Sequence, residues 1–506
     1  MKWFVFLSVL LVTLRLPAER INQEGRILEP LPAVTSPLLF NTTNADAVVS
    51  AMQIFPVTNP WNECISNRPV LANSDAMIAR ITTNLSSNHR TLVAEYEMNF
   101  VLLPDNQPRV LIALFNYANE SDLDGGTGTN GLYPIPANLP IENWPFPNTN
   151  ALSQWQTNDD GSDRHAIMVE PGAGFIWETW ETTLVGTNWQ ASNGAKFNLN
   201  TNGLRTDGWT SGDAAGFPMF PALVRFDEAE RGMVEHACRL VVAKSLYGHY
   251  IYPATHFAAP TNNTSTNLPA MGQRLRLKTG FVIPTNWTTE AKAVSLGLKK
   301  YGAMVADNGS VFSISVTPDN RWPANCFDNL TSISITNFEV IQTTATNEGP
   351  RSAGAPVAYA GPDQTVVFGH ATTLAGAVSF SNAPPVIQWK AYPGPGTVTF
   401  GNAAQTNTTA NFSAPGTYTL ELSADDGIHA VAYDAVVVSV TNVIQVSIAR
   451  AGTNVYVSWL GGVAPYVVQR SGALATNSWS DVVTTSVTNT NLPLTNTSGF
   501  FRVKGQ

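Results

Sequence analysis

The stretch GSDRHAIMVEPGAGFIWETWET, from Gly161 to Thr182, predicts the β character of the chain. Its two apolar runs are separated by PGAG, a composition typical of a turn between strands. Strand side chains alternate between two faces. The alternation places together Asp163, His165, Ile167 and Val169 in the first strand, and Ile176, Glu178, Trp180 and Thr182 in the second. An aspartate and a histidine on an apolar face need hydrogen-bond partners, either each other or another polar group.

Short apolar runs of this kind fill the region from Ala45 to Thr344, with turn residues between them. Two helices interrupt them. One is NWTTEAKAVSLGLKKYG, with Thr285 or Asn286 as its cap and Gly302 as its end, and the shorter one is SDAMIARI. We expect a mainly β protein with a large β-rich, sandwich-like domain that contains one or two helices, followed by two small β-sandwich domains.

The length of 506 residues favours about three or four domains. TTATNEGPRSAGAP has the composition of a linker. The predicted segments are a signal peptide (1–18), an irregular lead-in (19–44), the large domain as a candidate catalytic or binding unit (45–344), the linker (345–355) and two small domains (356–441 and 442–506).

The N-terminus indicates export. Lys2 precedes an apolar core from Trp3 to Leu14, and Leu16-Pro17-Ala18 suits a cleavage site. We expect a secreted, extracellular or periplasmic protein without a stable membrane anchor, because no later apolar run has the length of a bilayer span. Charged residues make up 13% of the chain and its net charge is −9, which disfavours nucleic acid as a partner.

Three cysteines leave the disulfide pattern open. Cys238 lies in an apolar run and is expected to be buried. If one bridge exists, Cys64 and Cys326 are the favoured pair, because both lie in loop-like sequence.

The region from Pro356 to Thr441 resembles PKD domains of the immunoglobulin-like type. The matching features are AGPDQ (360–364), Trp389, PGTY (415–418) and DDG (425–427). The resemblance implies a β-sandwich that acts as a spacer or binding module, with Trp389 between its sheets. The tail from Asn442 to Gln506 resembles a fibronectin-III-like module. The large domain is similar to a group of secreted bacterial proteins, a resemblance that implies secretion and no particular activity.

Candidate catalytic residues come from two stretches. In the first, Asp163 and Glu178 form a candidate carboxylate pair for glycoside hydrolysis, with His165 beside them and Trp180 as a stacking surface for sugar. The alternative is a hairpin whose acids face water. The second stretch, Asn202 to Leu240, begins as a long loop that places aromatic, acidic and hydroxyl groups together, as a sugar subsite requires. It adds the catalytic candidates Asp213, Asp227 and Glu228 and the substrate-binding candidates Trp209 and Arg225.

Histidines offer a different chemistry. His236 alternates with Val234, Cys238 and Leu240, the pattern of a histidine within the core. Together with His165 and His256 it could also hold a metal or contact substrate, although the spacing matches no metal motif. NESDLDGG (119–126) could bind a structural calcium ion or form an acidic turn; no other cofactor is indicated.

These observations favour a secreted carbohydrate-active enzyme, a glycoside hydrolase or a polysaccharide lyase with paired carboxylates. A non-catalytic glycan-binding or adhesion protein is the first alternative, and a histidine-based metalloenzyme is the second. In the first two cases the partner is a polysaccharide or a cell-surface glycan.

Overall fold

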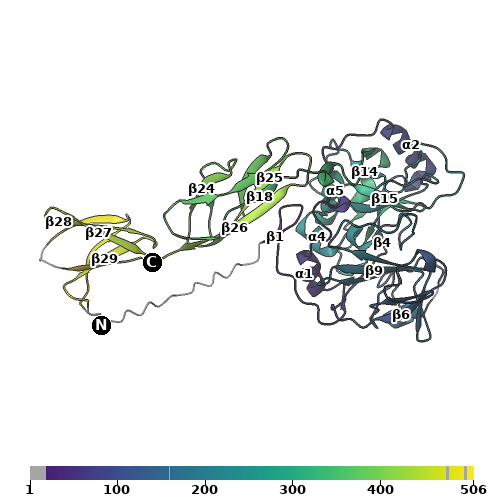
Figure 1. The fold of residues 1–506 in the computed structure, drawn as a ribbon, viewed down its shortest axis with the longest axis horizontal. Helices are drawn as coiled ribbons and strands as arrows, with labels where there is room; N and C mark the ends of the chain where they lie inside the picture. Colours follow the sequence, from purple (N-terminus) through teal and green to yellow (C-terminus); the bar gives the residue numbers. More distant parts are fainter. Residues whose placement is uncertain (1–18, 159, 475–477, 495–498, 506) are drawn as a thin grey trace, which may run out of the picture. The chain divides into compact units, whose positions relative to one another are not determined.

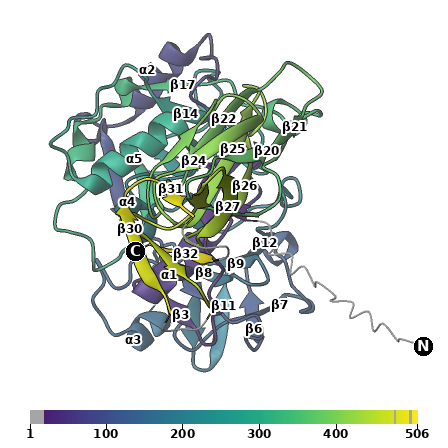
Figure 2. The same ribbon diagram turned by 90° about the vertical axis from the view of Figure 1, so that its left-hand side faces the viewer.

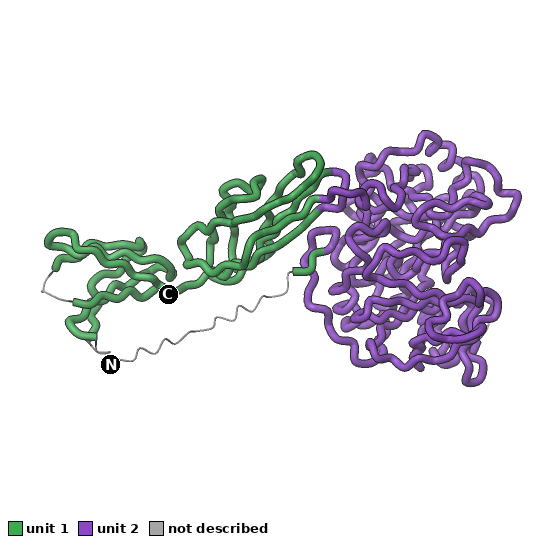
Figure 3. Tube along the Cα trace, in the orientation of Figure 1, with its two compact units in different colours: residues 1–21, 356–426, 432–506 green, residues 22–355, 427–431 purple. Residues whose placement is uncertain are grey.

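The computed structural model describes residues 19–158, 160–474, 478–494 and 499–505. The chain is mainly β, as predicted, and divides into two compact units (Figures 1 and 3). The larger unit comprises residues 22–355 with 427–431, and the smaller one comprises the remaining C-terminal residues and a short N-terminal segment. Each unit is described separately.

Three sheets form the framework of the larger unit. The four-stranded sheet has the order β10 (Thr183–Val185), β11 (Asn188–Ala191), β6 (Val110–Leu114), β7 (Asn130–Tyr133). The five-stranded sheet has the order β12 (Asn193–Asn198), β9 (Phe175–Trp180), β8 (Ala166–Glu170), β5 (Val101–Leu102), β3 (Leu38–Leu39). The six-stranded sheet has the order β17 (Phe338–Val340), β14 (Arg274–Leu277), β15 (Ala303–Asn308), β13 (Cys238–Val242), β16 (Phe312–Val316), β4 (Leu92–Tyr96). A further short strand, β2, spans Ile27–Leu28.

The predicted hairpin forms the centre of the five-stranded sheet. Strands β8 and β9 pair antiparallel, with Ile167 opposite Glu178. Ile167 lies in one hydrophobic core, and its neighbours Ala166 and Met168 lie in another. The hairpin therefore separates two cores, which explains why both of its faces read as apolar.

Five α-helices are found in the described part of the larger unit, more than the one or two expected. They are α1 (Thr43–Ala51), α2 (Ser74–Asn84), α3 (Leu152–Thr157), α4 (Phe226–Arg231) and α5 (Thr289–Lys300). The two predicted helices correspond to α2 and α5, which pack against β17 and β14 respectively (Figure 2). The shorter α3 and α4 escaped sequence reasoning because six residues give too few turns for a helical period to be recognised.

Helix α5 begins later than predicted. Its cap is Thr288, whose side chain accepts a hydrogen bond from the Ala291 backbone N–H at 3.2 Å, rather than Thr285 or Asn286. In the helix that starts after Thr288, the residues Ala291, Val294 and Leu298 lie on the buried face. The end was predicted correctly, since Gly302 adopts φ 69° directly after the last residue of the helix and its cap.

The smaller unit contains two β-sandwiches, each with a core shared between its sheets. Residues 357–441 form sheets of β19 (Gln364–Val367), β26 (Ala432–Thr441), β25 (Gly416–Asp425), β22 (Val386–Ala391), and of β20 (Thr372–Ala375), β24 (Asn407–Phe412), β23 (Val398–Phe400), with the pair β18 (Val357–Tyr359) and β21 (Ala377–Ser379). Residues 445–504 form sheets of β27 (Gln445–Ala451), β28 (Asn454–Leu460), β31 (Asn489–Pro493), and of β30 (Ser480–Thr485), β29 (Tyr466–Ser471), β32 (Phe500–Lys504). The short β1 (Arg20–Ile21) also belongs to this unit.

The segments predicted as lead-in and linker both contact the larger unit. Arg26 forms an ion pair with Glu235 at 2.9 Å. Arg351, within the short 3-10 helix η7 (Gly349–Arg351), forms an ion pair with Glu63 at 3.2 Å and donates a hydrogen bond to the Thr58 carbonyl at 3.0 Å. Both arginines therefore help to hold irregular chain in place, and in the lead-in Leu31, Val34 and Leu38 also pack against the hydrophobic core.

The predicted signal peptide, residues 1–18, lies outside the described residues. Within the part of the chain that the structure describes, none of the helices has the length and apolar character needed to cross a membrane.

The three cysteines are all unpaired. The favoured bridge between Cys64 and Cys326 is therefore wrong: Cys64 is exposed and contacts Ser66, whereas Cys326 is buried beside the Tyr96 hydroxyl at 3.9 Å. Cys238 is buried in the core, as expected.

Trp389 provides a test of the first sandwich. Its side chain is 1% exposed, and its indole N–H donates to the Gln405 carbonyl at 3.0 Å. We expect Trp389→Ala to cost about 3–5 kcal/mol of local stability, because a large cavity replaces the indole. Hydrogen exchange of peptides covering β22 and β25 in the full chain measures this loss. Val386→Ala, on the same strand at a side chain that is 72% exposed, is the control and should change stability by less than about 0.5 kcal/mol. Equal exchange in the two variants would contradict the assignment of Trp389 to the core.

Candidate active site

One face of the six-stranded sheet is polar. Strands β4 and β16 pair in parallel, with Ser315 opposite Glu95, and β13 pairs with β16 through Val241 and Ser313. Alternate residues of these strands, among them Leu240 and Ile314, lie in the hydrophobic core. Residues that alternate with these, together with Asp307 of β15 and with Glu97 directly after β4, define the polar sheet face: Glu95, Glu97, Arg239, Asp307, Ser313 and Ser315.

Arg239 links the acids of this face. Its guanidinium donates to Asp307 at 2.8 Å and to Ser315 at 3.2 Å, and lies 3.5 Å from Glu97. The Arg239 side chain is 3% exposed, whereas those of Glu97 and Asp307 are 19% and 27% exposed. The two carboxylates are therefore partly open to solvent while the cation that holds them is not.

Asp213 binds the same guanidinium from the interior. Its two oxygens accept from Arg239 Nε and Nη2, each at 3.1 Å, a bidentate geometry that fixes the orientation of the guanidinium. Asp213 belongs to the long loop that follows β12, which contains neither helix nor strand from Leu199 to Met219. This ion pair is one of the interactions that order the loop.

Glu178 anchors the next part of the loop. Its carboxylate is fully buried and accepts hydrogen bonds from the backbone N–H groups of Met219 and Phe220, each at 2.9 Å. Burial raises the pKa of Glu178 to about 7, although these two backbone donors oppose the shift. Because the Glu178 carboxylate has no solvent contact and binds backbone N–H groups of the loop, it positions the loop and does not reach substrate.

His165 forms the third attachment of the loop. Nδ1 lies 2.9 Å from the Glu142 carboxylate and Nε2 lies 2.6 Å from the Gly212 carbonyl oxygen. Both partners are hydrogen-bond acceptors. Both ring nitrogens therefore donate, and the imidazole is doubly protonated and positively charged. Burial alone would lower the pKa of His165, but the negative charge of Glu142 raises it to about 9.

The polar sheet face carries excess negative charge. Burial raises the pKa of Glu97 to about 7, and the neighbouring carboxylates of Glu142 and Glu95 add to the shift against the opposing charge of Arg239. Burial and Asp307 likewise raise the pKa of Asp213 to about 6, again against Arg239. The network therefore binds a proton near neutral pH, as a general acid must.

The predicted pair of Asp163 and Glu178 does not form. Asp163 is exposed and accepts a hydrogen bond from Trp180 Nε1 at 3.1 Å, whereas Glu178 lies in the interior. The alternation failed at Arg164, whose φ of 46° breaks the extended backbone between Asp163 and His165. His165 finds its partner in Glu142 instead, which fulfils the alternative that it bonds to another polar group.

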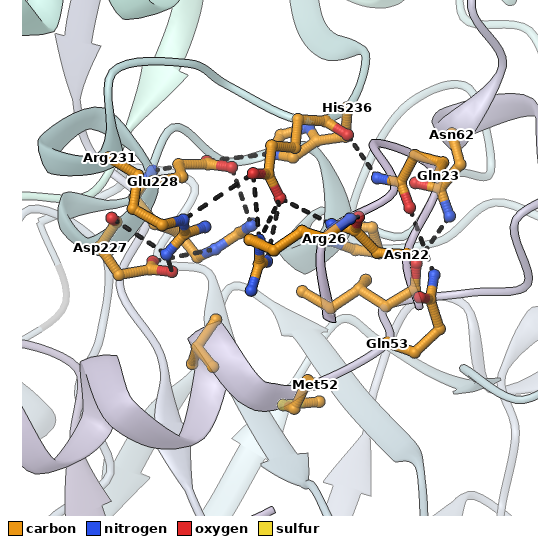
Figure 4. A pocket seen from close by; sticks show the side chains of 15 residues that line it. Asn22, Gln23, Arg26, Met52, Gln53, Asn62, Asp227, Glu228, Arg231 and His236 are labelled. Atoms are coloured by element: carbon orange, nitrogen blue, oxygen red, sulfur yellow. Dashed lines mark hydrogen bonds and ion pairs between the residues drawn. The ribbon is translucent and has the colours of Figure 1, made fainter. Parts of the chain in front are cut away.

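Asp227 and Glu228 belong to a separate buried cluster (Figure 4). Glu228 binds Arg225 at 3.1 Å and His236 at 3.0 Å, and Asp227 binds Arg231 at 2.7 Å. Burial would raise the pKa of Glu228, but Arg225 and His236 lower it to about 2. Arg225 is itself buried and donates to the Leu223 carbonyl, so these residues stabilise the start of α4 and do not face substrate.

The cavity beside this cluster is small. Its volume is about 30 Å³, which holds about one or two water molecules but no sugar ring. Arg26, Glu235 and side-chain amides such as Gln23 and Gln53 line it (Figure 4). We assign the cavity to the packing of the N-terminal segment.

His236 does not lie on a strand, contrary to its predicted place beside Cys238 and Leu240. Strand β13 begins only at Cys238, and the imidazole contacts Glu228 and the Ala237 carbonyl oxygen through its two nitrogens. The period-two pattern placed His236 among apolar residues. The chain is irregular before Cys238, however, and the His236 ring faces the cluster of Glu228 and Arg225 instead.

The two other predicted substrate contacts lie on loops. Trp209 is half-buried, and the Arg205 guanidinium lies 5.7 Å from the centre of its ring. His256 is half-buried, bonds the Ala214 carbonyl through Nδ1 at 2.8 Å, and stacks on Phe257. His256 thus lies beside the loop residue that follows Asp213.

The predicted metal sites lack suitable geometry. Within the described residues, no group of three or more His, Cys, Asp or Glu side chains is arranged to hold a metal ion. In the NESDLDGG segment, protein donors occupy the acids: Asp122 binds Arg205 at 2.5 Å, and Asp124 binds Lys196 at 2.6 Å and the Trp177 indole at 2.8 Å. These donors take the place that calcium would fill, so the segment is an acidic turn.

Sequence reasoning missed Glu95, Glu97, Glu142, Arg239 and Asp307. A signal for three of them was present. In RTLVAEYEMNF both glutamates alternate with apolar residues, and in HACRLVV the arginine does the same. Glu142 and Asp307 gave no local signal, because their partners lie far away in the sequence.

Searches against protein-family models and among curated proteins found no match. Among solved structures, the chain is similar to domains A168–A170 of titin, with 14% identity and a TM-score of 0.15, over 33% of this chain and 72% of that one. A TM-score of this size carries no argument about fold or function.

His165 makes stability depend on pH. Its folded pKa of about 9 exceeds the reference value of 6.5, so its pairing stabilises the fold fully below about pH 6.5 and is lost as the pH rises through 9. We expect the melting temperature of the full chain to fall between about pH 7.5 and 9.5, above the range in which Glu97 and Glu178 titrate. Glu142→Gln should remove most of this fall. Calorimetry at each pH checks it, and the exposed Glu230→Gln variant should behave as wild type.

Glu228 tests the structural assignment of the second cluster. We expect Glu228→Gln to cost about 3–5 kcal/mol, because it removes the carboxylate that binds both Arg225 and His236 and leaves the buried Arg225 only the longer contact to Asp227 at 3.7 Å. Urea unfolding of the full chain, followed by hydrogen exchange in α4, measures the loss. Glu230→Gln on the same helix is exposed and should have almost no effect. If Glu228→Gln is as stable as this control, the cluster does not stabilise α4.

Proposed function

We propose that this chain is a secreted carbohydrate-active enzyme that hydrolyses a neutral polysaccharide at the polar sheet face. The observation that carries the proposal is the shared guanidinium of Arg239, which holds Glu97 and Asp307 side by side at a partly exposed surface. Glu97 contacts Nη1 and Asp307 contacts Nη2 of this guanidinium, so one cation brings together two acids, the residue types that glycoside hydrolases use as a pair.

The two acids suit different roles. With a pKa of about 7, Glu97 holds a proton near neutral pH and is the general acid that protonates the leaving oxygen. Asp307, paired with Arg239 at 2.8 Å, is the carboxylate that activates water or attacks the sugar. Asp213, His165 and Glu178 are positioning residues, since they are buried and act through Arg239 and the loop.

Hydrolysis suits this face better than lyase chemistry. A lyase must neutralise the carboxylate of a uronic acid with a cation or a metal ion. Of the six residues that define the polar sheet face, three are acids and the cation, Arg239, is already bound by carboxylates. A polyanionic substrate would be repelled from it.

A non-catalytic glycan-binding or adhesion protein is the second candidate, and Trp180 favours it. This tryptophan lies near the surface beside an exposed acid, Asp163, away from the buried Glu178. In either case we propose that the two C-terminal sandwiches, with their PKD-like and fibronectin-III-like sequences, are spacer or binding modules that carry the larger unit.

Amide variants test the catalytic pair. We expect Glu97→Gln and Asp307→Asn to lower turnover about 10²–10⁴-fold, because each removes a proton-transfer group or nucleophile. Release of reducing ends from xylan, mixed-linkage β-glucan, galactomannan and starch is the measurement. Wild-type activity should also decline as the pH rises above about 7, where Glu97 loses its proton.

Asp75→Asn, at an exposed acid of α2, is the control and should retain full activity. Near-ultraviolet circular dichroism establishes that each variant is folded. Full activity in both amide variants, or activity that rises steadily to pH 9, would exclude Glu97 and Asp307 from catalysis.

A further inference from the structure

A surface beside the β8–β9 hairpin exposes aromatic rings. Phe115 is 54% exposed and Tyr117 is 38% exposed. Their backbone N–H groups donate to the carbonyls of Ala191 and Ser192 at 3.0 and 2.9 Å, so this segment extends the pairing of β6 with β11. Both rings are exposed beside this pairing.

Trp180 enlarges this surface. Its ring centre lies 5.9 Å from that of Tyr117, and the two planes differ by 39°. The indole N–H is bonded to Asp163, which fixes the orientation of the ring. Tyr117 and Trp180 therefore form a continuous aromatic surface, and Asp163 fixes the orientation of the tryptophan ring. We use the name aromatic patch for Phe115, Tyr117, Trp180, Asp163 and Glu181.

The polar groups of the patch are mainly acceptors. Glu181 accepts a hydrogen bond from Ser192, which in turn accepts one from Asn116 at 2.7 Å. Asp163 accepts the Trp180 indole N–H through Oδ1 and is exposed to solvent. Both charged residues of the patch are acids, so it attracts neutral hydrogen-bond donors and repels polyanions.

We propose that the aromatic patch binds a neutral polysaccharide chain. The apolar faces of sugar rings pack on aromatic plates, and sugar hydroxyls donate to flanking carboxylates. Large exposed aromatic side chains that are clustered mark interaction sites on soluble proteins. The ligand class rests on the proposed function, but binding at the patch uses neither Glu97 nor Asp307.

Affinity electrophoresis of the full chain tests the proposal. Native gels contain xylan, mixed-linkage β-glucan or galactomannan, with polygalacturonate as the anionic comparison. We expect at least one neutral polymer to retard wild type and polygalacturonate not to do so. Tyr117→Ala and Trp180→Ala should weaken retardation about tenfold or more. Tyr247→Ala is the control, because Tyr247 is also 38% exposed and lies outside the patch.

Glu97→Gln separates this proposal from the proposed function. Retardation of this variant at the wild-type level, with loss in Tyr117→Ala, supports the patch whether or not reducing ends are released. Release of reducing ends with normal retardation of Tyr117→Ala supports the enzyme and overturns the patch. Absence of retardation by all three neutral polymers, or equal retardation by polygalacturonate, also overturns it.

Discussion

A single buried guanidinium, that of Arg239, joins the long loop of the larger unit to its six-stranded sheet. A cation without solvent contact requires anions and acceptors around it, because burying an unpaired charge is prohibitively unfavourable. Asp213 comes from the long loop, Asp307 from β15 and Ser315 from β16. Removal of the guanidinium would leave these three groups without the donor that brings them together, so the loop and the sheet depend on the same side chain.

The long loop is ordered by polar contacts rather than by secondary structure. It is tied to the sheets at three successive points: His165 at the Gly212 carbonyl, Asp213 at Arg239, and Glu178 at the Met219 and Phe220 backbone. Each contact satisfies a backbone or charged group that would otherwise be buried without a partner. Glu178 lies on β9 and His165 directly before β8, and both hold the loop beside the polar sheet face.

Local sequence patterns predicted the fold class, the hairpin and the helix α5, because these features depend on periods of two or 3.6 residues. The candidate site was predicted only in part. His165 and Glu178 both bind the loop that carries Asp213. Asp163 was misplaced, because Arg164 adopts a left-handed backbone conformation that breaks the alternation. Partners such as Glu142 and Asp307 are set by tertiary packing, which no local period records.

The two charged clusters contain similar residues but differ in whether their carboxyl groups can exchange a proton near neutral pH. In the α4 cluster, cations match the acids closely, and the pKa of Glu228 falls to about 2. At the polar sheet face the acids Glu97, Asp213 and Asp307 share Arg239, and burial raises the pKa of Glu97 to about 7. Glu228 is ionised throughout the physiological range, and its cluster only stabilises structure. The second can gain or lose a proton near neutral pH at a side chain that solvent reaches, which is what acid–base chemistry requires of a site.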